Sequence, residues 1–236
     1  MSKQSGSASD KNIKSAWGSF GKGDYDKAFD LFNEATESGK DRSALFGRAC
    51  SLYRMADYEG AIDDLNKLAK SEPSNPEIFH TRAHVYGSNE QYDKALADLE
   101  KVLSLDPENA EAWCDMGGLY LVTEEYSEAS RCFGKTADLD KSCACAWLGK
   151  GVTALLMKEV KKAGEYLNIA LKLDKKNTLA YMARAELSFS NGNSNEAIKD
   201  VKKLFSLDND FKQRFSEQYA SNEGDDEDRF DEKDIV

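Results

Sequence analysis

The sequence repeats itself about every 34 residues, and this period restricts the chain to a stack of similar units. Each unit holds two stretches of about 14 residues with the apolar periodicity of a helix, joined by a short polar break. An alanine marks each second stretch, and in the first four units a tyrosine stands three residues before it. A further alanine or glycine precedes each marker by twelve positions. The marker alanines are Ala28, Ala61, Ala95, Ala129, Ala163 and Ala197.

Small residues at fixed positions allow two helices to approach closely, while bulky neighbours fill the remaining space. The two stretches of each unit therefore predict an antiparallel helix hairpin, and polar segments such as DPENAE predict the turns between hairpins. One hairpin cannot bury its apolar face alone, so successive hairpins have to stack. The sequence predicts an all-α solenoid of six hairpins.

Two units carry the fullest pattern, PEIFHTRAHVYGSNEQYDKALADLEKVLSLDPEN and AEAWCDMGGLYLVTEEYSEASRCFGKTADLD. With six coherent units over residues 9–210, the chain resembles the tetratricopeptide-repeat (TPR) family. The resemblance implies a right-handed superhelical solenoid of antiparallel hairpins, in which the first helices of the units line a concave groove. It also implies that the ligand is an extended or helical segment of a partner protein.

The ends of the chain differ in composition from the repeats. Residues 1–8 are polar, and we expect them to be disordered. Within residues 211–220, aromatic side chains spaced four apart predict a helix that caps the last hairpin. Residues 221–236 carry eight acidic side chains against two basic ones, which predicts a disordered acidic tail.

Composition excludes several classes of function. The net charge of -11 leaves no basic face for phosphate groups, so we do not expect nucleic-acid binding. No apolar run approaches the ~18 residues of a membrane span, and the polar first residues lack the apolar core of a signal peptide. The odd number of cysteines, five, indicates free thiols in a reducing compartment. We therefore expect a cytoplasmic protein that is not inserted in a membrane.

A charged pair covaries between the units. In three units an arginine of the first stretch is matched by an aspartate sixteen residues later. Where Met116 replaces the arginine, Cys132 replaces the aspartate, and Lys150 is matched with Tyr166. This joint change predicts partly buried ion pairs across each hairpin. The alternative is that the arginines bind an acidic ligand, which their acidic companions oppose. The pairs are Arg48–Asp64, Arg82–Asp98 and Arg184–Asp200.

The family's groove positions, carried over to this chain, predict a partner-binding surface. It is apolar and aromatic at both ends with a polar belt in the middle, and exposed apolar surface of this kind marks a partner site. The Lys and Asn residues with which chaperone-binding members clamp a carboxylate pair are absent, which argues against Hsp70 or Hsp90 C-terminal tails as ligands. The predicted groove residues are Trp17, Phe46, Cys50, Tyr53, His80, His84, Cys114, Leu148, Val152 and Met182.

Three of these residues also form a candidate metal site. His80 and His84 share one helix face, and with the thiolate of Cys114 they would suit zinc or another soft-to-borderline metal. The alternative is that the histidines bind a peptide through hydrogen bonds. HTRAH lacks the glutamate of the HExxH metalloprotease helix, and SCACAW offers CxC in place of CxxC.

Catalytic signals are missing from the sequence. It contains no Gly-rich phosphate loop, no nucleophile elbow and no acid–base pair in a catalytic context. We expect neither enzymatic activity nor a cofactor. The leading hypothesis is a non-catalytic TPR scaffold or adaptor that binds an apolar or amphipathic partner segment in its groove. The alternatives are a metal-responsive accessory protein built around the His/Cys set and a self-association module that uses the same apolar surface.

Overall fold

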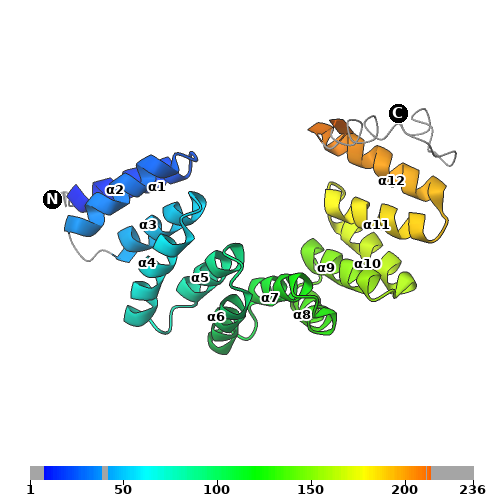
Figure 1. Ribbon diagram of the computed structural model, residues 1–236, viewed down its shortest axis with the longest axis horizontal. Coiled ribbons are helices and arrows are strands. Elements are labelled where there is room, and N and C mark those ends of the chain that lie inside the picture. Colours follow the sequence, from blue (N-terminus) through cyan, green and yellow to red (C-terminus); the bar gives the residue numbers. More distant parts are fainter. Residues whose placement is uncertain (1–7, 39–41, 211, 214–236) are drawn as a thin grey trace, which may run out of the picture. The chain divides into compact units, whose positions relative to one another are not determined.

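The computed structural model describes residues 8–38, 42–210 and 212–213, and every regular element in these ranges is an α-helix (Figure 1). The helices alternate as the six predicted antiparallel hairpins. The predicted capping helix and acidic tail lie outside the described residues except for residues 212 and 213, as does nearly all of the predicted N-terminal segment. The helices are α1 (Ala8–Phe20), α2 (Tyr25–Ser38), α3 (Arg42–Arg54), α4 (Tyr58–Ser71), α5 (Pro76–Ser88), α6 (Tyr92–Leu105), α7 (Ala110–Val122), α8 (Tyr126–Leu139), α9 (Ala144–Leu156), α10 (Val160–Leu173), α11 (Thr178–Ser190) and α12 (Ser194–Leu207).

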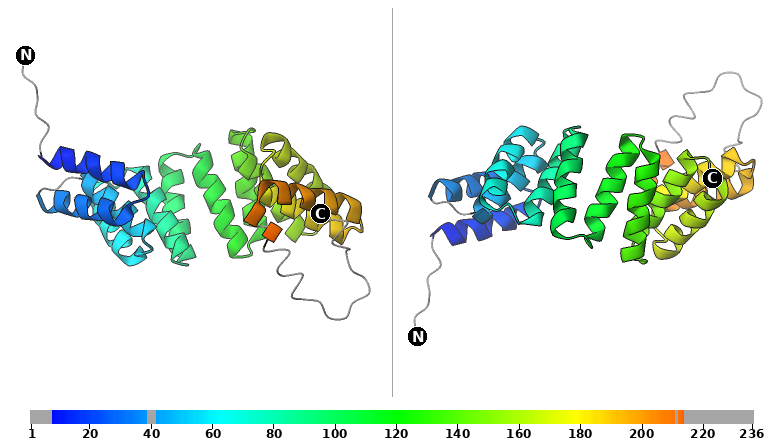
Figure 2. Two further views of the ribbon diagram at one scale, coloured as in Figure 1. Left: turned by 90° about the horizontal axis from the view of Figure 1, so that it is seen from above. Right: turned by 90° about the horizontal axis from the view of Figure 1, so that it is seen from below.

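The chain divides into two compact units, the first ending at Ala112 and the second beginning at Trp113. In the first unit, α2 packs on α3 and α4 packs on α5, so each hairpin covers the next. In the second unit, α8 packs on α9 and α10 packs on α11. The first helices of neighbouring hairpins are also in contact: α1 contacts α3, and α9 contacts α11. Both views in Figure 2 show the hairpins of each unit side by side.

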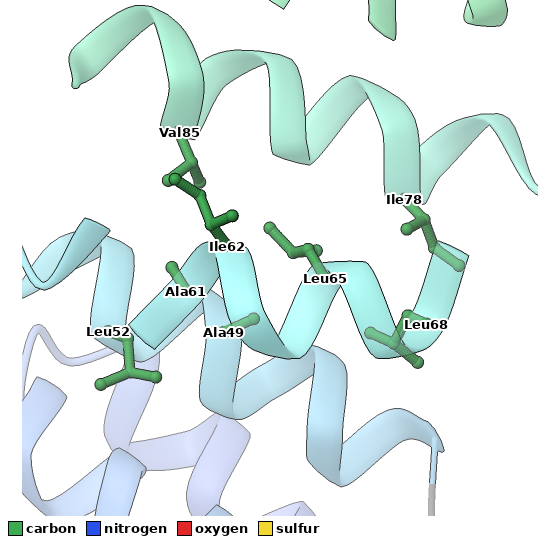
Figure 3. Close-up of a cluster of buried hydrophobic side chains, with 8 residues drawn as sticks. All are labelled: Ala49, Leu52, Ala61, Ile62, Leu65, Leu68, Ile78 and Val85. Atoms are coloured by element: carbon green, nitrogen blue, oxygen red, sulfur yellow. The ribbon is translucent and has the colours of Figure 1, made fainter. Parts of the chain in front are cut away.

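The marker alanines are the contact points of this packing. All six are fully buried, with 0% of their surface exposed. Between them lie clusters of larger side chains, and Figure 3 shows the cluster built around α4. Ile62 of α4 extends toward Val85 of α5 there, while Leu68 lies near Ile78. The second helix of a hairpin thus contributes to the core on both of its sides.

Glycines of the first helices leave room for aromatic rings. A Cβ atom on Gly47 would lie 2.3 Å from the ring of Phe32, and one on Gly149 would lie 2.5 Å from the ring of Phe133. Both rings are buried and come from the second helix of the preceding hairpin. The glycines therefore allow neighbouring hairpins to approach closely.

Each hairpin turns through one residue in the left-handed backbone conformation. The residue has a φ between 57° and 81° and recurs at the same repeat position in all six hairpins. Only the first and last are glycines, and side chains larger than hydrogen are strained there. The six residues are Gly23, Ala56, Glu90, Glu124, Lys158 and Gly192.

The three predicted ion pairs are confirmed. In each, the arginine Nε and Nη2 atoms donate to the two carboxylate oxygens of the aspartate. The two bonds between Arg82 and Asp98 measure 2.7 and 2.6 Å. Hydrogen bonds to the aspartates raise the pKa of both Arg82 and Arg184, so these guanidinium groups stay charged. The pairs join the two helices of hairpins two, three and six.

An asparagine completes each of these pairs. The Nη1 atom of the arginine donates to an asparagine of the preceding hairpin, over 2.6 Å to Asn33, 2.8 Å to Asn66 and 2.6 Å to Asn168. Each arginine thus connects three helices: its own, the second helix of its hairpin and the second helix of the hairpin before. Arg48 connects α2, α3 and α4 in this way, and Arg184 connects α10, α11 and α12.

The lysine of the fifth hairpin makes a different contact. The Lys150 Nζ atom lies 4.4 Å from the ring centre of Tyr166 and 4.6 Å from that of Trp147. A cation–π contact therefore occupies the place of the ion pair found in hairpins two, three and six. The covariation of Lys150 with Tyr166 follows from this direct contact.

Candidate functional site

The ten predicted groove residues all lie on the first helices of the hairpins, from α1 to α11. None of them is buried: His84 and Met182 are exposed, and the other eight are half-buried. Each therefore keeps part of its side chain available to a ligand.

A hollow of about 690 Å³ lies in the first unit. It brings together Trp17 of α1 and Phe46 of α3, two of the predicted groove residues, with Glu77 of α5. Apolar side chains form part of its lining, and polar groups accompany them. An ion pair joins two of these polar residues, Arg42 and Glu72. The other lining residues are Ser43, Leu68, Asn75 and Ile78.

Two aromatic groove residues of the first unit are held in place by the core. The ring of Trp17 contacts the ring of the fully buried Phe32 edge-on, at 5.0 Å between centres, and that of Phe20 at 5.5 Å. The Tyr53 hydroxyl of α3 forms a hydrogen bond of 3.0 Å with the Ser88 hydroxyl of α5. These contacts fix the orientation of the rings before any ligand binds.

The polar belt of the first unit includes two histidines of α5 and a cysteine of α3. The rings of His80 and His84 lie 4.8 Å apart on α5, tilted by 33°. Burial raises the pKa of Cys50 to about 12, with a further contribution from the charge of Glu77. Cys50 is therefore a neutral thiol at physiological pH. Cys114, the third predicted metal ligand, belongs to the second unit, so the metal set remains a prediction.

The second unit presents an apolar face on α9 and α11. Leu148 and Val152 of α9 pack on the core around Leu167 and Leu187 and keep their outer surface free. On α11, Met182 is 42% exposed and Leu179 is 61% exposed. These side chains offer apolar surface at the spacing of one helix face.

Three cysteines gather at the start of α9. The Cys145 Sγ atom lies 2.8 Å from that of Cys114 on α7 and 2.9 Å from that of Cys143, the residue that caps α9. All three thiols are free. The pKa of Cys145 is raised, chiefly by its hydrogen bond with Cys114 and then by burial. Burial also raises the pKa of Cys143.

Our sequence interpretation missed this cluster because it compared CxC only with metal and redox motifs. The repeat contained the signal. Cys145 stands one helical turn before Leu148, and Leu148 occupies the position in its unit that Cys114 occupies in the preceding one. The two cysteines therefore belong to the same face of consecutive first helices.

Family models of the tetratricopeptide repeat match the sequence in three places, at residues 43–75, 88–147 and 179–211. The first match spans the hairpin of α3 and α4, the last spans that of α11 and α12, and the middle match runs from the end of α5 into α9. The chain is a tetratricopeptide-repeat protein. A search of curated proteins finds no match.

Solved TPR structures share the fold. A tetratricopeptide-repeat protein from Parabacteroides merdae ATCC 43184 matches with a TM-score of 0.73 and 22% identity, over 84% of this chain and 79% of that one. PilF of Pseudomonas aeruginosa matches with a TM-score of 0.72 and 17% identity, over 89% and 97%. YrrB, described as a TPR protein with an unusual peptide-binding site, matches with a TM-score of 0.59 and 18% identity, over 80% and 97%.

The TPR fold is that of protein-interaction scaffolds, which are in general not catalytic. Among the residues that the structure describes, no helix has the length and apolar character needed to cross a bilayer.

Proposed function

We propose that this TPR protein is a non-catalytic cytoplasmic scaffold or adaptor whose first-helix faces bind an apolar or amphipathic segment of a partner protein. The observation that carries the proposal is the hollow of the first unit, where Trp17 and Phe46 meet beside polar groups. The free cysteines fit the reducing cytoplasm.

The hollow has the composition of a side-chain pocket. Its aromatic and aliphatic lining would bury an apolar side chain of the partner, which is the main driving force for association. Its polar residues would bind the backbone of the partner on either side. Trp17 is already oriented by Phe32, so little side-chain entropy would be lost on binding.

The second unit supports an amphipathic partner segment. Leu148 and Val152 lie four residues apart on α9, and Met182 adds apolar surface on α11. Apolar anchors of a helix at i, i+3 and i+4 match such a surface. The description of YrrB as a TPR protein with an unusual peptide-binding site is consistent with this proposal.

A display library of random peptides tests the proposal. Peptides enriched on the full chain should carry apolar anchors, and their affinity should fall about 30-fold or more in a Phe46→Asp or a Met182→Asp variant, the loss expected for a binding hot spot. Val160→Asp is the matched control, because Val160 is 45% exposed, close to the 42% of Met182, but lies on the second helix α10.

Helix content, measured by circular dichroism, establishes that each variant is folded. If the enriched peptides bound all three variants as tightly as the wild type, the first-helix faces would not be the binding surface. Light scattering over a range of protein concentrations separates partner binding from self-association through the same apolar residues.

A further inference from the structure

Cys145 is the middle member of a group of three sulfur atoms on the surface of the second unit. Its side chain is exposed, whereas Cys114 and Cys143 are half-buried. Sγ distances of 2.8 and 2.9 Å place both neighbours in direct contact with it. The remaining two cysteines, Cys50 and Cys132, do not share in this contact.

The sulfur distances favour a covalent bond over a shared metal ion. Two thiolates bound to one zinc ion, with bonds of about 2.3 Å, lie roughly 3.8 Å apart. The contacts at Cys145 are about 1 Å shorter than that separation. A disulfide of about 2.05 Å needs the sulfur atoms to close by less than 1 Å.

Cys114 is the better placed of the two partners. It approaches Cys145 from a separate helix, α7, so a bond between them would leave the backbone of α9 as it is. Cys143 is the N-cap residue of α9, with an extended backbone, and it lies only two residues before Cys145, so a bond between them would have to close a short ring across the start of the helix. Joining them would disturb the first turn.

The geometry points to Cys114 and Cys145 as a thiol–disulfide site that a hydroperoxide oxidises. One sulfur of the pair, as the thiolate, attacks one peroxide oxygen, the O–O bond breaks and hydroxide leaves, which produces a sulfenic acid. The other sulfur then attacks the oxidised one, and water leaves as the S–S bond forms. Two thiols and one hydrogen peroxide yield one disulfide and two waters, with two electrons passing from sulfur to oxygen. The bond joins α7 to α9 and is reversed by an external dithiol.

This inference does not depend on the proposed function, and it is tested on the full reduced chain. After treatment with stoichiometric hydrogen peroxide, two of the five thiols should be lost and the mass should fall by about 2 Da. Trypsin under non-reducing conditions should release the peptide of Cys114 joined to SCACAWLGK. Dithiothreitol should restore all five thiols.

Two serine variants assign the bond within that peptide, which contains both Cys143 and Cys145. Cys143→Ser should still lose two thiols and give the cross-linked peptide, whereas Cys145→Ser should give no cross-linked peptide. Survival of all thiols in the folded wild type would overturn the inference, and so would a cross-link that persists in Cys145→Ser. Stoichiometric zinc binding abolished by Cys145→Ser would also overturn it, because the sulfurs would then be metal ligands.

Discussion

Replacement of Arg82 should lower the stability of the third hairpin. Its partner Asp98 is 6% exposed, and the two form a bidentate ion pair. Arg82→Met would leave that carboxylate buried without a counter-charge, which destabilises a protein by about 3–5 kcal/mol. We expect the urea midpoint of unfolding to fall accordingly. Fluorescence-detected unfolding of the full chain measures it.

The fourth hairpin provides the control for this change. Its equivalent positions hold Met116 and Cys132, which are both buried. The double variant Arg82→Met/Asp98→Cys copies this apolar pair and should recover most of the lost stability. If the double variant were as unstable as Arg82→Met alone, the unpaired charge would not be the cause.

Covariation between repeats predicted the pairs but not the asparagines that complete them. Asn66 bonds Arg82 from the preceding hairpin, so it lies outside the unit in which the pair was sought. The pattern is nevertheless present in the sequence. Asparagine occurs before each paired arginine, whereas Glu100 and Gly134 stand at that position before Met116 and Lys150. A comparison across neighbouring units would have found it.

At the scale of the element, the turn inside each hairpin is the point of strain. Lys158 occupies the left-handed conformation with a φ of 61°, and Gly192 occupies the same position one repeat later with a φ of 75°. Lys158→Gly should stabilise the chain by about 0.5–1 kcal/mol, because glycine adopts this conformation without a steric cost. Gly192→Ala should destabilise it by about 1 kcal/mol. Thermal unfolding measures whether Lys158→Gly raises the stability and whether Gly192→Ala lowers it.

The helices were predictable from apolar periodicity, but the conformation of these turns was not. Glycine is the usual signal for a left-handed residue, and only two of the six turns have one. In the other four, packing of the two helices imposes the conformation on Ala56, Glu90, Glu124 and Lys158. Stabilisation by Gly192→Ala would contradict the strain assigned to this position.

At the scale of the whole molecule, the repeat specified the fold, whereas the candidate site depends on distances between hairpins that no single unit encodes. Trp17 and Phe46 were both predicted groove residues, but the hollow that joins them arises from the packing of α1, α3 and α5. The thiol cluster likewise requires α7 beside α9. Repeat position therefore predicted which residues lie on the first helices, but it did not predict the distances between their side chains.

We expect the stack of hairpins to unfold locally. The helix pairs with extensive contact in the described residues are neighbours or next-but-one along the chain. Stability of a repeat array is then a sum of terms from each hairpin and its neighbours. Phe32 is fully buried in the first hairpin and packs on Trp17, so Phe32→Ala should cost about 3–5 kcal/mol there.

Hydrogen exchange followed by mass spectrometry should show which helices lose stability in Phe32→Ala. Amides of α1, α2 and α3 should exchange faster in Phe32→Ala than in the wild type, because these helices contact one another directly. Amides of α9 to α12 should keep their protection, since none of their extensive contacts involves the first hairpin. A uniform loss of protection along the chain would instead mean that the repeats unfold as one cooperative body.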